Sequence, residues 1–268
     1  MTSPILKWAG GKRWLVAGGR LPKPQNYNRY VEPVLGRAAG FFHLKPKAAL
    51  LSDLNADLIN LYRVVRDAPG EFEERMFVHQ AMHSKEYYYE VRSHSCVDKI
   101  DAAARFLYLN RTCWNGLYRV NKRGEFNVPI GTKQAVIMET DDFQSVSEAL
   151  KLTELRNEDF EVIVDETRTG DFLFVDPPYT VQHNFNGFLK YNERIFSWQD
   201  QVRLRDSLQR AAQRGVSIVL TNADHVSVRE LYGRGFLYKQ LARQSVLAGK
   251  SDGRGSTTEA IFTYNLEY

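Results

Sequence analysis

The sequence predicts an α/β fold, an open, doubly wound sheet into which a mainly helical subdomain is inserted. Short continuous apolar runs, typical of strands covered on both faces, alternate with amphipathic stretches typical of helices. The alternation is interrupted once, by about a hundred residues that look mainly helical, whereas most connections in compact domains have ~4–6 residues. Such a long interruption indicates an insertion rather than a loop.

Apolar runs that are bounded by turn residues are the predicted strands. They are Tyr30–Val34, Ala49–Ser52, Glu161–Val164, Phe172–Asp176, Val216–Thr221, Phe236–Leu241 and Ala260–Tyr264. Helices are predicted at Asn55–Arg66 and Trp198–Gln213, and Gly215 stands where a glycine commonly ends a helix.

The domain boundaries follow from the interruption. Residues 1–55 and 145–268 are expected to form the main domain, and residues 56–144 the inserted one. Within the insertion, helices are predicted at Gly70–His79, Lys85–His94 and Ile100–Leu109. The segment Gly116–Pro129 is predicted as a β-hairpin that turns at Lys122-Arg123-Gly124.

Composition places the chain among ordinary globular proteins. Hydrophobic residues make up 43% of the 268 residues and charged residues 25%. No apolar run is long enough to span a membrane, and Met1–Arg20 does not resemble a secretory leader. The two cysteines, Cys96 and Cys113, do not suggest a disulfide framework, so we expect a reducing cytoplasm. The six histidines show no metal-ligand spacing, so no metal is expected.

The net charge of the chain is only +4, but several positively charged residues fall in one short segment of the insertion. The segment interleaves basic and aromatic side chains, namely Arg111, Trp114, Tyr118, Arg119, Lys122 and Arg123. Such a pattern suits a surface that follows a nucleic-acid backbone and stacks on bases. The alternative is an ordinary solvated face.

A rigid polar corner follows the predicted strand at Phe172–Asp176. It consists of Asp176-Pro177-Pro178-Tyr179, in which two prolines fix φ and remove two backbone donors. Ligands of open α/β sheets bind beyond the carboxyl ends of the strands, so chemistry is expected here. The alternative is a stiff turn after a buried strand.

The groups of this corner suit methyl transfer to an exocyclic amine. Such an amine is a poor nucleophile because its lone pair is delocalised into the base. The Asp176 carboxylate and the Pro177 carbonyl would each accept a hydrogen bond from one amine N–H group. The two bonds would make the nitrogen more tetrahedral and stabilise its developing positive charge. Tyr179 would stack on the base, and much of the rate would come from holding the amine in line with the methyl donor.

Taken in order, the motifs resemble those of the Dam-type, class α, DNA adenine-N6 methyltransferases over nearly the whole chain. The matching segments are Leu6–Lys12, Glu32-Pro33 with Gly36, Ser52–Ile59, Leu109–Arg111, Trp114–Leu117, Arg119, Asn121, Arg123–Pro129 and Asp176–Tyr179. The resemblance implies a Rossmann-like methyltransferase sheet with an inserted target-recognition domain, and S-adenosylmethionine as cofactor.

The resemblance assigns cofactor roles to several positions. Trp8 and Lys12 match residues that contact S-adenosylmethionine, and Glu32 and Gly36 match the loop under its methionine moiety. Asp53 is placed to accept hydrogen bonds from ribose hydroxyls, with helix capping as an alternative role. The remaining cofactor contacts implied are Asp159, Phe160 and Asp176.

The chain departs from the family pattern at Ala38. The family usually has a second glycine two residues after the first, whereas Arg37-Ala38 follow Gly36 here. Ala38 is expected to narrow the loop and weaken cofactor binding.

The hairpin segment resembles the family's recognition element for GATC. Arg119 would read a guanine, since arginine bidentate to guanine is the commonest specific major-groove contact, with a phosphate contact as the alternative. Trp114 would fill the gap left by the extruded adenine, with packing in the subdomain core as the alternative. The other implied DNA contacts are Lys7 at the outer base pair, Leu117 and Pro129 on the thymine side, and Arg111, Asn115, Asn121 and Arg123.

The resulting expectation is a monomeric, cytoplasmic, nucleoid-associated enzyme that methylates adenine N6 in duplex GATC, in DNA replication or restriction–modification. The segment His183–Phe196 is expected to close over the extruded base, with Phe185, Tyr191 and Phe196 as walls. Three alternatives stay open. They are another target sequence or cytosine N4, a DNA-binding homologue with weakened catalysis, and a protein-glutamine or RNA amine methyltransferase.

Overall fold

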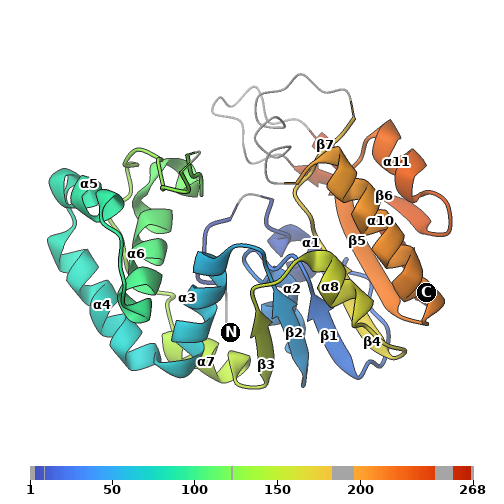
Figure 1. Ribbon diagram of the computed structural model, residues 1–268, viewed down its shortest axis with the longest axis horizontal. Coiled ribbons are helices and arrows are strands. Elements are labelled where there is room, and N and C mark those ends of the chain that lie inside the picture. Colours follow the sequence, from blue (N-terminus) through green and yellow to red (C-terminus); the bar gives the residue numbers. More distant parts are fainter. Residues whose placement is uncertain (1–3, 9, 122, 183–195, 245–255, 267–268) are drawn as a thin grey trace. The chain divides into compact units, whose positions relative to one another are not determined.

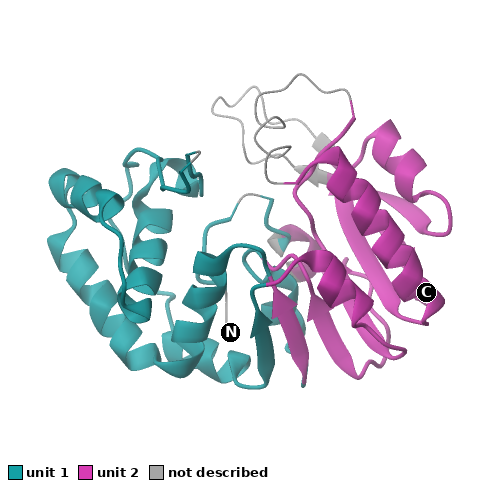
Figure 2. Ribbon diagram, in the orientation of Figure 1, with its two compact units in different colours: residues 1–13, 36–47, 53–157 teal, residues 14–35, 48–52, 158–268 magenta. Residues whose placement is uncertain are grey.

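A computed structural model describes residues 4–8, 10–121, 123–182, 196–244 and 256–266. The chain divides into two units, which Figure 2 distinguishes by colour. Unit 1 comprises residues 1–13, 36–47 and 53–157, and unit 2 comprises residues 14–35, 48–52 and 158–268.

A seven-stranded sheet has the strand order β3-β2-β1-β4-β5-β7-β6 (Figure 1). In chain order the strands are β1 (Arg29–Glu32), β2 (Ala49–Ser52), β3 (Thr153–Arg156), β4 (Asp171–Val175), β5 (Ser217–Ala223), β6 (Leu237–Gln244) and β7 (Ser256–Tyr264). Within unit 2, β2, β1, β4 and β5 are parallel, and β7 runs antiparallel to both β5 and β6. This mixed sheet confirms the predicted α/β class.

The parallel strands of unit 2 are buried on both faces, which explains their continuous apolar sequences. Val31 and Leu173 belong to a hydrophobic core that also contains side chains of the helices on one face. These helices are α8 (Phe160–Asp165), α10 (Trp198–Gln213) and α11 (Val226–Tyr232). The alternating residues Tyr30 and Phe172 are fully buried as well, with ring centroids 5.7 Å apart.

Helix α10 begins and ends as its sequence predicts. Ser197 and Asp200 form a capping box at its start. Arg214 ends the helix, and Gly215 follows it with φ +83°, the left-handed conformation that favours glycine.

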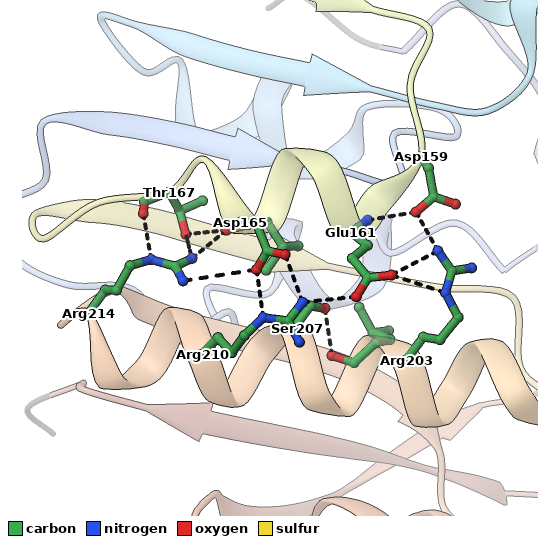
Figure 3. A network of polar contacts seen from close by, with 10 residues as sticks. Asp159, Glu161, Asp165, Thr167, Arg203, Ser207, Arg210 and Arg214 are labelled. Atoms are coloured by element: carbon green, nitrogen blue, oxygen red, sulfur yellow. Dashed lines mark hydrogen bonds and ion pairs between the residues drawn. The ribbon is translucent and has the colours of Figure 1, made fainter.

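The predicted strand at Glu161–Val164 is wrong, because these residues belong to helix α8, and the third strand is β3 at Thr153–Arg156. The side chain of Asp159 caps α8 by accepting from the Glu161 N–H at 2.9 Å. Between α8 and α10, acidic side chains of α8 pair with arginines of α10: Glu161 with Arg203 and Arg210, and Asp165 with Arg210 (Figure 3). The other predicted strands overlap β1, β2, β4, β5, β6 and β7.

Unit 1 is mainly helical. Its helices are α2 (Ala39–Leu44), α3 (Ala56–Asp67), α4 (Pro69–Met82), α5 (Lys85–Ser93), α6 (Lys99–Thr112), the 3-10 turn η1 (Trp114–Gly116) and α7 (Phe143–Leu150), while α1 (Arg13–Ala17) begins at its border with unit 2. The helices predicted in the insertion correspond to α4, α5 and α6. Asn55 caps α3 by accepting from the Asp57 and Leu58 N–H groups.

The units differ from the expected domains because unit 1 also contains residues 1–13, 36–47, 53–55 and 145–157. Two side chains of α6 attach the N-terminal segment to the helices. The Asn110 side chain accepts a hydrogen bond from the Lys7 backbone N–H at 2.9 Å and donates one to the Lys7 carbonyl at 2.7 Å. The Arg111 guanidinium donates to the Ile5 carbonyl at 2.9 Å.

The predicted hairpin at Gly116–Pro129 is present as a short antiparallel turn. Among its described residues, an isolated bridge joins Val120 to Phe126. The Asn127 N–H donates to the Arg119 carbonyl at 3.1 Å, and Gly124 lies in the turn with φ +80°. The segment is therefore a compact loop rather than a pair of regular strands.

Candidate functional site

The strand order of unit 2 reverses between β1 and β4. The chain moves outward from β1 to β2 and later returns to place β4 on the other side of β1. Adjacent parallel strands have their carboxyl ends at the same edge, and ligands of open α/β sheets bind at such a reversal. Glu32 ends β1, and Asp176 directly follows β4, so both predicted site residues lie at this edge.

Asp176 opens the predicted corner and is oriented by the neighbouring strand. The hydroxyl of Thr221 on β5 donates to Asp176 Oδ1 at 2.7 Å. Thr221 is 1% exposed, so this donor is held in one place by the core. Pro177 is buried, whereas Asp176 is only partly buried. The structure therefore presents the carboxylate at the sheet edge in a fixed orientation.

Tyr179, at the end of the corner, is held by a second carboxylate. Its hydroxyl donates to Glu259 Oε2 at 2.8 Å, and Glu259 lies on β7. Burial raises the pKa of Tyr179 well above its ordinary value, and the carboxylates of Asp176 and Glu259 raise it further. The phenol therefore stays protonated and acts as a donor.

Glu32 has a similar partner inside unit 2. The buried hydroxyl of Tyr30 donates to Glu32 Oε2 at 2.9 Å, and Glu32 itself is 2% exposed. Burial and the Glu32 charge raise the pKa of Tyr30 well above its ordinary value, with a smaller contribution from Asp176. Two phenol–carboxylate hydrogen bonds, Tyr30–Glu32 and Tyr179–Glu259, thus belong to this part of the sheet.

The predicted cofactor residues of unit 1 follow β1 and β2 along the chain. Gly36 has φ +50°, and its N–H donates to Asp53 Oδ2 at 3.0 Å. The other oxygen of Asp53 accepts from the Asn55 N–H at 2.9 Å. A Cβ at Gly36 would lie 3.1 Å from the Trp8 ring, so only glycine fits without displacement. Trp8, Gly36 and Asp53 are therefore brought together, and the capping role belongs to Asn55.

Two further residues of the cofactor set lie in constrained surroundings. Lys12 is 2% exposed, and its ammonium donates to the Gly10 carbonyl at 2.7 Å. Ala38 is fully buried and adopts a left-handed backbone with φ 55° and ψ 36°. Ala38 therefore occupies a conformation that favours glycine.

Asp159 and Phe160 are committed to the junction of α8 and α10, as Figure 3 shows for Asp159. Asp159 caps α8 and pairs with Arg203 at 2.8 Å. The guanidinium of Arg203 lies 4.9 Å from the centroid of the Phe160 ring, and Phe160 is 7% exposed. Their placement fits a structural role as well as the predicted contact with the cofactor's adenine.

The predicted DNA-contacting segment presents its side chains to solvent. Trp114 is 51% exposed, so the alternative of a core tryptophan is not supported. Asn115, Arg119, Arg123 and Pro129 are exposed, and Leu117 and Asn121 are partly buried. Arg119 Nε donates to Asn127 Oδ1 at 2.8 Å, and Asn121 accepts from the backbone N–H groups of Arg123 and Glu125. Local hydrogen bonds thus shape the loop and orient its arginine.

Arg111 corrects one of the predicted DNA contacts. Its side chain is fully buried and forms a bidentate ion pair with Asp141, at 2.5 and 2.8 Å. The same guanidinium donates to the carbonyls of Ile5 and Val136. A fully buried guanidinium that is paired with Asp141 does not reach a phosphate, so the role of Arg111 is structural.

Lys7 lies beside Arg111 but is only partly buried. Its ammonium donates to the Arg111 carbonyl at 3.2 Å. Burial lowers the pKa of Lys7, and the positive charges of Lys133 and Arg111 lower it further. The cations of Lys7, Arg111 and Lys133 are thus close enough to interact electrostatically.

The structure adds Thr221, Glu259 and Tyr30 to the site. The sequence carries no local signal for Thr221 and Glu259, because the Thr221–Asp176 and Glu259–Tyr179 bonds join residues 45 and 80 positions apart. Of the predicted lid, Phe196 is buried against Phe160, and its other residues, including Phe185 and Tyr191, lie outside the described residues, as does Lys122.

Within the described ranges, no helix is both long and apolar enough to cross a membrane. Over the same ranges, no three or more His, Cys, Asp or Glu side chains are grouped so that they could hold a metal ion.

Comparison with known proteins gives one consistent result. The family model described as D12 class N6 adenine-specific DNA methyltransferase matches residues 8–246. The Type II methyltransferase M1.LlaDCHI of Lactococcus lactis subsp. cremoris is 38% identical, over 97% of this chain and 94% of that protein. The Type II methyltransferase M.MjaIII of Methanocaldococcus jannaschii is 34% identical, over 94% of each chain. A DNA adenine methylase of Vibrio cholerae serotype O1 is 30% identical, over 98% of this chain and 96% of that protein.

Proposed function

The chain belongs to the D12 class of N6 adenine-specific DNA methyltransferases, and from this premise we propose its donor and its target. S-adenosylmethionine is the methyl donor, and the adenine of GATC in duplex DNA is the acceptor. The observation that carries the proposal is the Asp176–Tyr179 corner, which follows β4 where the strand order reverses and is held by Thr221 and Glu259.

The chemistry of the residues after β1 and β2 fits S-adenosylmethionine. A ribose needs acceptors for its hydroxyls, and Asp53 supplies a carboxylate, whose oxygens each have two lone pairs. Gly36 lets the backbone approach a ligand closely, since no Cβ fits there. Lys12 would meet the cofactor's carboxylate, and Glu32 would line the methionine moiety. Trp8, Asp159 and Phe160 complete the proposed cofactor set.

In the proposed mechanism, the protein's contribution is orientation and electrostatics. The bound cofactor supplies a methyl group made electrophilic by its sulfonium. Asp176 and the Pro177 carbonyl accept hydrogen bonds from the two N–H groups of the adenine amine. These bonds direct the nitrogen lone pair toward that methyl group. Pro178 stiffens the corner, and Tyr179 stacks on the base. No nucleophilic side chain is needed, because the amine attacks directly.

The loop that follows α6 is the proposed DNA-reading surface. Arg119 reads a guanine of GATC, Leu117 and Pro129 contact the thymine side, and Trp114 fills the gap left by the adenine. The adenine must leave the stack, at a cost of a few kcal/mol, approximately. Further proposed contacts are Lys7 at the outer base pair and Asn115, Asn121 and Arg123 on the loop.

The exposed, locally basic loop supports binding of one protein molecule to duplex DNA, and we expect a cytoplasmic monomer that associates with the nucleoid. The relatives include Type II methyltransferases, so a different adenine-containing target sequence is the second candidate.

The target is tested with labelled S-adenosylmethionine and duplexes that differ only at GATC. The wild type should label the GATC duplex, and Arg119→Ala should lose ~1–3 kcal/mol of discrimination between it and a duplex with a changed guanine. Arg75→Ala is the control, because Arg75 is an exposed arginine of α4 that pairs with Asp101. Equal weakening of binding to all sequences by Arg119→Ala would make Arg119 a phosphate contact. Equal labelling of both duplexes by the wild type would refute GATC as the target.

A further inference from the structure

Glu259 is an acidic residue inside the sheet. It lies on β7 opposite Ala223 of β5, and it is 4% exposed. A buried carboxylate is costly unless hydrogen bonds compensate it. One of its bonds comes from the hydroxyl of Tyr179 at 2.8 Å. This bond joins the inside of the sheet to the corner that follows β4.

The β5–β7 pair carries two such links on the same face. Thr221 lies opposite Ile261, and Ala223 lies opposite Glu259. Side chains two residues apart in a strand share a face, and so do directly opposite residues of an antiparallel pair. Thr221 and Glu259 therefore point to the same side of the sheet. There Thr221 donates a hydrogen bond to Asp176, and Glu259 accepts one from Tyr179.

We propose that Glu259 is a positioning residue, which holds the ring of Tyr179 at the angle needed to stack on the target adenine. The inference rests on the proposed function, in which Tyr179 stacks on that base. Glu259 touches neither DNA nor cofactor in this role and acts only through the phenol.

Tyr179 needs a positioning partner because the Asp176–Tyr179 corner fixes the backbone but not the tyrosine ring. Two prolines restrain the chain before Tyr179, whereas its side chain keeps two rotatable bonds. A hydrogen bond to a charged acceptor is among the stronger ones and selects one orientation. Because the pKa of Tyr179 is raised, the phenol remains the donor. The ring is thus ordered before the base arrives.

The proposal is tested with Glu259→Ala, Glu259→Gln and Tyr179→Phe in the full chain, using a duplex that the wild type methylates. We expect Glu259→Ala and Tyr179→Phe to lower kcat about ten- to a hundredfold, because a misplaced ring no longer holds the amine in line. The Kd for DNA should stay unchanged. Glu259→Gln keeps an acceptor for the phenol and should restore kcat to within about threefold of the wild type.

The double variant Tyr179→Phe with Glu259→Ala separates a shared bond from two independent effects. Since both substitutions break the same bond, the double variant should be no slower than the slower single variant. In a second readout, 2-aminopurine replaces the target adenine and reports stacking by its fluorescence. Glu259→Ala should change the fluorescence of the bound duplex, and Glu259→Gln should not.

Asp171→Ala is the matched control for loss of a buried carboxylate. Asp171 is 5% exposed, pairs with Arg29 at 2.7 Å and begins β4, at the edge opposite the corner. It should lower the melting temperature without lowering kcat. The proposal is overturned by full kcat in Glu259→Ala, by failure of Glu259→Gln to rescue, by additive losses, or by an equal loss of kcat in Asp171→Ala. A wild type that methylates no adenine contradicts the proposed function instead.

Discussion

Two positions shortly after β1 adopt a left-handed backbone, and one of them is not glycine. Gly36 has φ +50°, and Ala38 has φ +55° at the start of α2. A left-handed backbone costs an alanine roughly 1–2 kcal/mol. The resemblance to the Dam family places a glycine at position 38. The chain thus keeps the family's loop shape but accepts strain in it.

Ala38→Gly should therefore stabilise the protein. Relief of the strain is partly offset by the larger entropy of glycine in the unfolded chain, so the expected gain is about 1 kcal/mol in the free energy of unfolding. Urea denaturation measures it. Ala102→Gly, inside helix α6, is the control and should instead lose about 1 kcal/mol. A loss of stability in Ala38→Gly would show that the surroundings prefer the methyl group.

At the scale of single residues, the sequence predicts motif residues better than their partners. Asp176 and Tyr179 are recognisable because a rigid Pro-Pro corner follows an apolar strand. Thr221 and Glu259 are not recognisable, since only the register of β5 and β7 brings them to the corner. Arg111 is misjudged for the same reason: its partner Asp141 lies 30 residues away, and nothing local marks the arginine as buried.

At the scale of elements, Arg111 joins three parts of unit 1. Its guanidinium donates hydrogen bonds to the carbonyl of Ile5 in the N-terminal segment, and to the Val136 carbonyl and the Asp141 carboxylate in the loop after the proposed DNA-reading segment. Its backbone belongs to α6. A buried ion pair is strongly destabilising to break, because the remaining charge is left without compensation.

Arg111→Ala should lower the free energy of unfolding by about 3–5 kcal/mol. Chemical denaturation measures this loss. The salt dependence of DNA binding by the folded protein should not change, because Arg111 contacts no phosphate. The exposed Arg123 offers the opposite case, since Arg123→Ala should leave stability unchanged and weaken DNA binding. A reduced salt slope in folded Arg111→Ala would return Arg111 to the DNA-binding set.

Helices with marked ends and apolar strands bounded by turn residues are predictable from the sequence, whereas a short run that suits both structures is not. The ends of α10 agree with its capping box and with Gly215, and β2 has the predicted bounds. In the run Glu161–Val164, three β-branched apolar residues follow the glutamate, and so short a run does not distinguish a strand from a helix turn. The Asp159 cap and the arginines of α10 decide for helix.

At the scale of the whole molecule, the chain order of the motifs agrees with the family to which the chain belongs. The Glu32–Gly36 and Asp176–Tyr179 motifs are separated by the long insertion, yet one begins at the end of β1 and the other follows β4, where the strand order of the sheet reverses. The relatives cover nearly all of the chain, so the insertion and the sheet belong to one family pattern.

The central claim, that Asp176 acts on the adenine amine, is tested most directly by methyl incorporation at N6 in Asp176→Ala and Asp176→Asn. Titration of cofactor and of duplex DNA accompanies the assay. Both variants should bind the duplex as the wild type does, while Asp176→Ala loses methyl transfer altogether, because the amine loses an acceptor that shapes and orients it. Full methyl transfer by Asp176→Ala would contradict the account.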